Sequence, residues 1–157
     1  MKSVMLSIRP KWCEKIASGE KTIEVRKTKP KLKTPFKCYI YCTNSGVATG
    51  MWGKHGKIVG EFTCNTVTNL FSNSRFWLNE DDVLQTCLSA AELRKYADGA
   101  NGLYGWHISD LVCYDKPKEL SEFKGLRKTK FGYEPVEIKR APQSWCYVEE
   151  WEGKKKG

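Results

Sequence analysis

Short stretches of alternating apolar and polar residues dominate this 157-residue chain, and few of them are separated by helical patterns. Alternation with a period of two is typical of strands that bury one face. Six stretches predict strands, at residues 3–9, 22–26, 36–43, 58–67, 101–113 and within 141–149. Because a parallel, doubly wound sheet needs helices between its strands, this order favours a mixed α+β fold. We expect a small β-barrel of about six strands with two or three short helices.

Two helices have clear boundaries. Pro10 occupies a position that proline tolerates at a helix start, and residues 11–18 follow with apolar residues on one side. Gly19 can end this helix because glycine adopts positive φ without strain. Ser89 begins a capping box for a second helix over 89–97. The other segments predict a mobile loop at 44–57 carrying Trp52 and His55, irregular structure at 69–82, a short edge segment at 115–123 and a charged loop at 125–140.

We expect a single domain over residues 1–151 and a disordered basic tail over 152–157. No apolar run reaches the roughly 20 residues that span a bilayer, and the N-terminus lacks the pattern of a signal peptide. The seven cysteines form no Cys-x-x-Cys pair and several lie in apolar strand patterns, which favours free thiols in a reducing cytoplasm. The two histidines are far apart, so we expect no metal site and no cofactor.

Positive charge is concentrated in the first third of the chain. Of the formal net charge of +9, residues 1–50 contribute +8, from 11 Lys and Arg against 3 Asp and Glu. The densest basic segment is residues 27–35, which its prolines mark as a loop. A localised basic field favours polyanions such as nucleic acid, and this loop could hold phosphates. The alternative is that the charge serves only solubility.

The segment from Gly19 to Arg26 combines a helix end, a turn and a strand. On an alternating strand, Glu24 and Arg26 project from the same face, and Lys21 lies at the turn beside them. Two cations and a carboxylate at one strand entrance could hold a polar ligand. The alternative is an edge strand with solvated charges and a weak surface ion pair.

These residues resemble the Gly-x-Lys-x-x-Glu-x-Arg motif of the ASCH domain family. The resemblance extends to three further segments: 7–10 before the first helix, 105–108 in a late strand, and 142–145, which is similar to phage and Firmicutes members. It implies a PUA-like β-barrel with a ligand cleft between the barrel and the helix that precedes the motif. It also implies binding of RNA or modified nucleosides.

A related branch of the family hydrolyses the acetyl group of acetylcytidine with a lysine, a threonine three residues later and a distant glutamate. Lys21 matches that lysine, but Glu24 stands at the threonine position. Because a carboxylate does not replace a hydroxyl nucleophile without a change of chemistry, this amidohydrolase activity is in doubt. Thr22 would share a face with Glu24 and is a weak substitute.

We weigh three functions. A binding module for RNA or a nucleotide-like small molecule would use Arg26 for two parallel bonds to phosphate, with a tryptophan stacking on a base. Its candidate ligand-binding residues are Arg9, Lys11, Trp12, Lys21, Glu24, Arg26, Trp106, Gln143 and Ser144, and Trp145 is a third candidate platform. A ribonuclease or amidohydrolase would use Lys21 to stabilise an anion, Glu24 as general base and Glu61 as a second acid. No amphipathic groove or peptide motif supports a protein-interaction module, and the oligomeric state is not fixed by the sequence.

Overall fold

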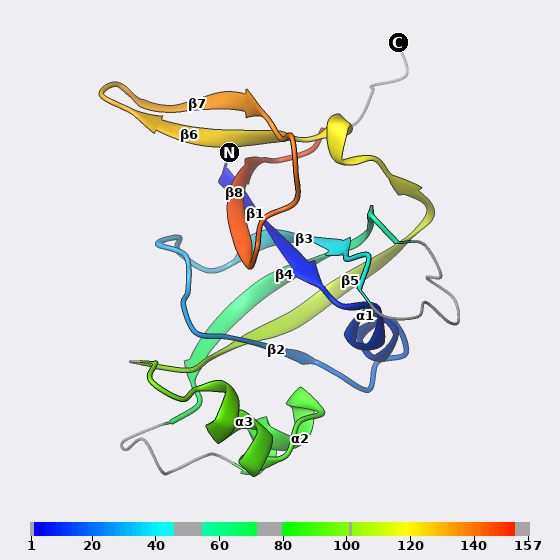
Figure 1. The fold of residues 1–157 in the computed structure, drawn as a ribbon, viewed down its shortest axis with the longest axis vertical. Coiled ribbons are helices and arrows are strands. Elements are labelled where there is room, and N and C mark those ends of the chain that lie inside the picture. The colour runs from blue at the N-terminus through cyan, green and yellow to red at the C-terminus, as the bar shows by residue number, and fades with distance from the viewer. Residues whose placement is uncertain (1, 46–54, 72–79, 101, 153–157) are drawn as a thin grey trace.

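The computed structural model describes residues 2–45, 55–71, 80–100 and 102–152 (Figure 1). Its strands are β1 Lys2–Ile8, β2 Ile23–Arg26, β3 Phe36–Cys42, β4 Lys57–Asn69, β5 Tyr104–Lys118, β6 Lys124–Thr129, β7 Gly132–Glu137 and β8 Trp145–Glu149. Its helices are α1 Pro10–Ala17, α2 Glu80–Thr86 and α3 Ala90–Tyr96, with a short 3-10 turn at Leu120–Glu122. Trp52, most of the 44–57 and 69–82 segments, and tail residues 153–157 lie outside the described residues.

One sheet contains all eight described strands, in the order β2-β5-β4-β3-β1-β8-β6-β7. The β1–β3 pair is parallel and the other pairs are antiparallel. Strand β2 lies at one edge and β7 at the other, so the sheet is curved but not closed. The prediction of a mixed α+β fold is confirmed, whereas the prediction of a six-stranded barrel is wrong in strand number and in closure.

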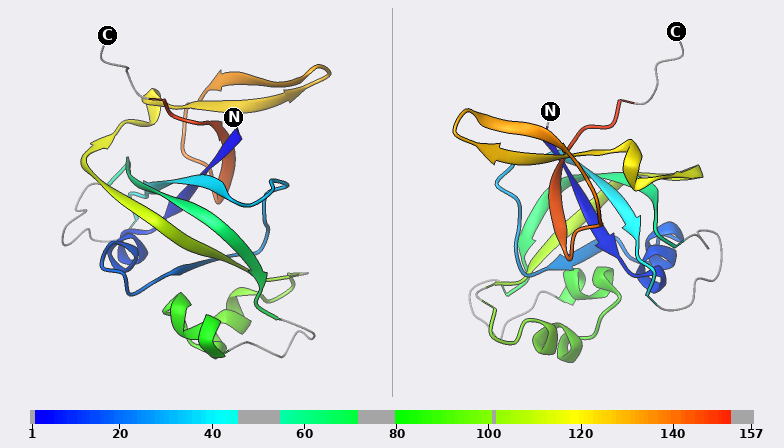
Figure 2. Two further views of the ribbon diagram at one scale, coloured as in Figure 1. Left: turned by 180° about the vertical axis from the view of Figure 1, so that it is seen from behind. Right: turned by 45° about the horizontal axis from the view of Figure 1, so that its top comes forward.

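The two additional strands come from the segment 125–140, which the sequence predicted as a charged loop. Strands β6 and β7 form a hairpin that projects above the rest of the sheet in Figures 1 and 2. Most of its side chains are exposed, and its backbone pairing with β8 is a single position, Gly125 with Val148. Its backbone hydrogen bonds are therefore mostly internal, and the apolar alternation that identifies half-buried strands is absent.

The main core lies between the curved sheet and α1. Val4, Leu6 and Ile8 of β1 pack there against Cys13 and Ile16 of α1. The opposite face of β1 and β3 is also covered, because Met5 and Tyr39 belong to a second buried cluster. Strand β3 is a central strand of the sheet, because it lies between β4 and β1.

Local sequence determines how the chain enters β2. Pro10 is the first residue of α1, and Gly19 has φ of +85°, the left-handed conformation that ends the helix turn. The chain then pairs with β5 only, with Glu24 opposite Trp106 and Arg26 opposite Tyr104. Helices α2 and α3 lie next to β2 on the side away from the hairpin (Figures 1 and 2). None of the helices in the described ranges is both long and apolar enough to cross a membrane.

Candidate functional site

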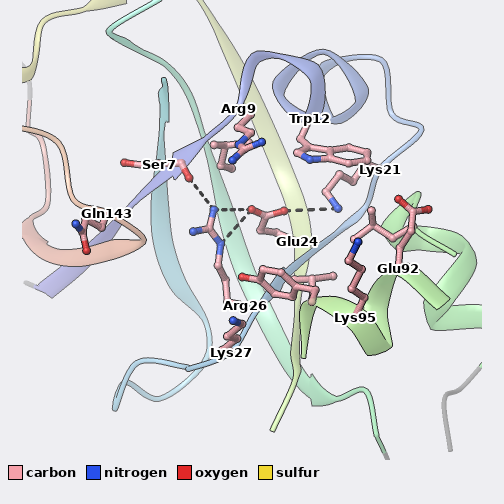
Figure 3. A pocket seen from close by; sticks show the side chains of 14 residues that line it. Ser7, Arg9, Trp12, Lys21, Glu24, Arg26, Lys27, Glu92, Lys95 and Gln143 are labelled. Atoms are coloured by element: carbon pink, nitrogen blue, oxygen red, sulfur yellow. Dashed lines mark hydrogen bonds and ion pairs between the residues drawn. The ribbon is translucent and has the colours of Figure 1, made fainter. Parts of the chain in front are cut away.

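A pocket of about 800 Å³ opens where the end of β1, α1, β2 and α3 meet (Figure 3). Its polar and charged lining residues are Ser7, Arg9, Lys21, Glu24, Arg26, Lys27, Glu92, Lys95 and Gln143, and its other lining residues are Ile8, Trp12, Val25, Leu88 and Tyr96. The pocket therefore combines several cations with aromatic surfaces. Both are features of sites that bind nucleotides.

Glu24 lies between two cations at the centre of this pocket. Its Oε2 accepts hydrogen bonds from Arg26 Nη2 at 2.7 Å and Nε at 3.1 Å, and its Oε1 lies 3.5 Å from Lys21 Nζ. The three residues are buried, with 6% of Glu24, 2% of Lys21 and 8% of Arg26 exposed. The alternative of solvated charges on an edge strand is therefore wrong, although β2 is an edge strand. The predicted common face of Glu24 and Arg26 explains their contact.

Arg26 joins β2 to the other side of the opening. Nη1 donates to the backbone oxygen and the Oγ of Ser144, at 3.1 and 3.0 Å, and Nη2 donates to the Ser7 backbone oxygen at 2.8 Å. With the two bonds to Glu24, all five guanidinium N–H groups have acceptors. Arg26 thus has no N–H left for a phosphate, which corrects the expectation of two parallel bonds to a ligand. Ser144 is engaged by Arg26 and does not line the pocket.

Lys21 is held from three directions. Its Nζ donates to the Thr86 backbone oxygen at 2.6 Å, lies near Glu24, and is 5.1 Å from the centre of the Trp12 ring. Burial lowers the pKa of Lys21 because desolvation penalises the ammonium, and the nearby Glu24 carboxylate opposes this shift. An ammonium has three donors, so one N–H remains beyond those directed at Thr86 and Glu24.

The structure brings six of the predicted ligand-binding residues to the pocket lining: Arg9, Trp12, Lys21, Glu24, Arg26 and Gln143. Lys11 is not among the lining residues, and its Nζ lies 4.7 Å from the centre of the Trp12 ring. Lys11 therefore contacts Trp12 but does not itself line the pocket.

Two tryptophans proposed as stacking platforms lie elsewhere. Trp106 is 0% exposed in the core, packs edge-on against Phe36 with ring centres 5.8 Å apart, and donates Nε1 to the Thr28 backbone oxygen. Trp145 packs edge-on against Trp106 and donates its Nε1 to Thr28 Oγ1 at 2.9 Å. The prediction that these two rings are stacking surfaces is wrong, because neither tryptophan lines the pocket.

The two additional catalytic candidates are also outside the pocket. Glu61, on β4, pairs with Lys37 at 3.0 Å and accepts a hydrogen bond from Tyr114 at 2.7 Å. Thr22 Oγ1 bonds to Gln85 Oε1 at 3.0 Å. The expectation of Glu61 as a second acid is therefore wrong, and Thr22 does not line the pocket either.

Sequence reasoning missed several lining residues, above all those of α3 and the turn before it: Leu88, Glu92, Lys95 and Tyr96. The helix itself was predicted from its capping box, and both hydrogen bonds of that box are present. Its position beside the motif depends on packing between segments some 70 residues apart in the chain. Lys27 also lines the pocket, whereas the sequence identified it only as the first residue of the basic loop.

The described ranges contain no group of three or more His, Cys, Asp and Glu side chains that could hold a metal ion. The pocket lining offers the carboxylates of Glu24 and Glu92, several cations and two aromatic rings.

The model of the ASCH domain matches residues 6–140 of the chain. The chain belongs to the ASCH domain family. Family membership supports a generic RNA-binding role, and the similarity to phage and Firmicutes members stays a prediction. No curated protein matches the chain.

Solved structures of an ASCH protein from Zymomonas mobilis share the fold. Its tyrosine-to-phenylalanine variant is 18% identical, with a TM-score of 0.58, and the match covers 96% of this chain and 92% of that one. Its serine-to-alanine variant is 18% identical, with a TM-score of 0.62 and coverage of 94% and 89%. A further structure of the Zymomonas mobilis protein is 18% identical, with a TM-score of 0.60, and the match covers 94% of this chain and 88% of that one. At this identity the likeness shows the shared fold alone and carries no residue roles.

Proposed function

We propose that this ASCH protein binds RNA or a modified nucleoside, with one base held in the pocket around Lys21 and Glu24. The observation that carries the proposal is the buried Lys21–Glu24 pair at the centre of an 800 Å³ pocket with aromatic and basic walls. Ligand pockets commonly measure 300–1,000 Å³, so the volume suits a nucleotide-sized guest.

The buried pair offers an acceptor next to a donor. Glu24 Oε2 is occupied by Arg26, whereas Oε1 has only the 3.5 Å approach of Lys21 and keeps capacity to accept a further bond. The remaining N–H of Lys21 supplies the donor. A base edge that presents an amine beside a ring acceptor complements this pair, as the N4 amine and N3 of cytosine do. Glutamate is a usual acceptor for the cytosine N4 amine.

The walls of the pocket fit the rest of a nucleotide. Trp12 and Tyr96 provide aromatic faces on which a base can stack. Arg9, Lys27 and Lys95 are exposed cations among the lining residues and can contact phosphate. Gln143 adds a neutral amide. In this arrangement Arg26 and Ser144 are positioning residues, because Arg26 fixes the orientation of Glu24.

The test is calorimetric titration of a nucleoside and nucleotide panel against the wild type and Glu24→Gln. The amide keeps the shape of Glu24 but loses its charge and one acceptor, so we expect at least a 10-fold loss of affinity for the best ligand. Glu61→Gln is the matched control, because Glu61 is a part-buried carboxylate paired with a lysine outside the pocket. Equal affinity of Glu24→Gln and the wild type contradicts the proposal, as does a panel that gives no binding.

A hydrolase acting on nucleic-acid components is the second candidate. It is favoured by the lowered pKa of the buried Lys21 beside a carboxylate, since perturbed pKa values are common in active sites. Lys21 would stabilise a developing anion and Glu24 would act on a water molecule. Product from acetylcytidine or single-stranded RNA that disappears in Lys21→Met supports this candidate. Absence of turnover at high protein concentration removes it and leaves binding alone.

A further inference from the structure

The loop over residues 27–35, which joins β2 to β3, carries four lysines at every second position: 27, 29, 31 and 33 (Figure 1). All four lysines are exposed, whereas Pro30 between them is buried and Leu32 packs against the main core. Pro30 and Leu32 anchor the loop, which has no strand partner among the described residues and bends at Lys27 and Lys31. One side anchors it and the other side presents only cations.

The anchors hold the loop in a defined shape. The Thr28 backbone oxygen accepts from Trp106 Nε1 at 3.3 Å, and the Lys31 backbone N–H donates to Tyr147 Oη at 2.9 Å. Thr28 Oγ1 accepts from Trp145 Nε1 at 2.9 Å. A loop that is fixed before binding loses less conformational entropy when a partner docks. These contacts also give a role to the two tryptophans that do not reach the pocket.

None of the described carboxylates forms an ion pair with these four lysines. In the part of the chain that the structure describes, no salt bridge involves any of them, and residues 27–37 contain five lysines and no Asp or Glu. Lys27 and Lys29 instead lie over the rings of Tyr96 and Tyr104, at 4.9 and 5.4 Å. Positive charge without internal compensation is available to an external polyanion.

The lysines lead away from the pocket. Lys27 lines the 800 Å³ pocket, and Lys29 and Lys33 line a second depression of about 550 Å³ between the loop and β4. The rest of that depression is neutral, with Thr34, Asn65 and Thr66 as its polar side chains. A third depression beyond it includes Glu150, so the uniformly non-acidic surface ends there.

We infer that residues 27–33 form a track for the backbone of a single-stranded RNA, one nucleotide of which occupies the pocket. In an extended chain, residues two apart are separated by at most ~7 Å, which is comparable to the step between phosphates of an extended single strand. The inference rests on the proposed function for the identity of the pocket ligand. It adds that the partner is a polynucleotide rather than a free nucleoside. Lys29, Lys31 and Lys33 do not line the pocket, so a ligand confined to the pocket would not contact them.

The experiment compares two triple variants by fluorescence anisotropy, with a labelled ten-nucleotide single-stranded RNA over a range of salt concentrations. Lys29→Gln/Lys31→Gln/Lys33→Gln removes the track but leaves Lys27 in the pocket. The matched control, Lys124→Gln/Lys128→Gln/Lys130→Gln, removes the same charge from exposed lysines of the β6–β7 hairpin. Melting curves of both variants check that these surface substitutions leave the fold intact.

We expect the track variant to bind the RNA at least 10-fold more weakly than the control variant. The slope of log K against log salt should fall by about 2, since each phosphate contact on a single strand contributes roughly 0.7. Affinity for a mononucleotide, measured by calorimetry, should be unchanged in the track variant. A duplex of the same length should bind more weakly than the single strand, because its bases are not free to enter the pocket.

Equal losses of RNA affinity in the two triple variants would overturn the track. Tighter binding of the duplex than of the single strand would also overturn it. If the mononucleotide binds but the RNA binds no better, the track is wrong while the proposed function stands. If the track variant loses RNA affinity but Glu24→Gln does not, the track stands and the pocket assignment falls.

Discussion

At the scale of single residues, Arg26 shows how a binding motif can be partly structural. Its guanidinium contacts Glu24 on its own strand, Ser7 on β1 and Ser144, which lies 118 residues away in the chain. These bonds link the free edge of β2 to the end of β1 across the opening of the sheet. The arginine therefore stabilises the position of Glu24 and the shape of the pocket at the same time.

Replacement of Arg26 by lysine should destabilise the protein by ~2–4 kcal/mol, because the buried Glu24 carboxylate loses its paired donors and the part-buried backbone oxygens of Ser7 and Ser144 lose their charged donor. A lysine keeps the charge but cannot reproduce the planar fork. Urea unfolding should show a lower midpoint with an unchanged slope.

Arg127→Lys is the control for this substitution. Arg127 pairs with Glu134 in the exposed hairpin, and an exposed pair contributes at most about 1 kcal/mol. Equal stability losses in the two variants would contradict the structural role of Arg26.

Lys21 should make stability depend on pH in the alkaline range. Its pKa is lowered in the folded protein by burial, so between that value and the ordinary 10.5 the unfolded chain binds more protons at this position. Stability from this group therefore rises as pH increases through that window. The free energy of unfolding of the wild type minus that of Lys21→Met should increase with pH below 10.5. A difference that is flat or decreases with pH would refute the lowered pKa.

At the scale of elements, α3 supplies one wall of the pocket through Glu92, Lys95 and Tyr96. The helix has only seven residues, and isolated helices of that length are unstable in water. Its capping box satisfies two backbone donors at its start, with Ser89 Oγ 3.0 Å from the Glu92 nitrogen and Glu92 Oε1 3.1 Å from the Ser89 nitrogen. The cap therefore contributes to the pocket although Ser89 does not line it.

Ser89→Ala should cost ~1 kcal/mol of stability through loss of this cap. It should also weaken binding of the pocket ligand several-fold, because the wall formed by α3 becomes less ordered. Urea unfolding and calorimetry measure the two effects. Ser121→Ala, in the exposed 3-10 turn far from the pocket, should change neither. Unchanged ligand affinity in Ser89→Ala would show that α3 is not part of the site.

At the scale of the whole molecule, the seven cysteines report on packing. All seven are free, four of them are buried, and Cys113 is exposed. Burial raises the pKa of Cys38 and raises the pKa values of Cys64 and Cys146 to about 11, so these thiols are poor nucleophiles in the native state. The four buried cysteines thus act as small core side chains, as the apolar strand patterns indicated.

Reaction with a chromogenic disulfide reagent should reveal one fast thiol in the native protein, assigned to Cys113 by its loss in Cys113→Ser. All seven should react in denaturant, without a reducing agent. Fewer than seven in denaturant would reveal a disulfide, and rapid reaction of four or more native thiols would contradict the packing of the core.

The sequence by itself determined most of the local structure. Alternation located β1 to β5 and β8, Pro10 and Gly19 bounded α1, and the capping box located α3, because each of these patterns acts over a few neighbouring residues. The common face of Glu24 and Arg26 followed from strand geometry alone. Only the tertiary structure decided that Arg26 is saturated, that Trp106 is a core residue, that α3 completes the pocket and that residues 124–137 form a hairpin. These outcomes depend on strand order and on contacts between distant segments, such as Arg26 and Ser144, which are 118 residues apart, and local periodicity does not encode them.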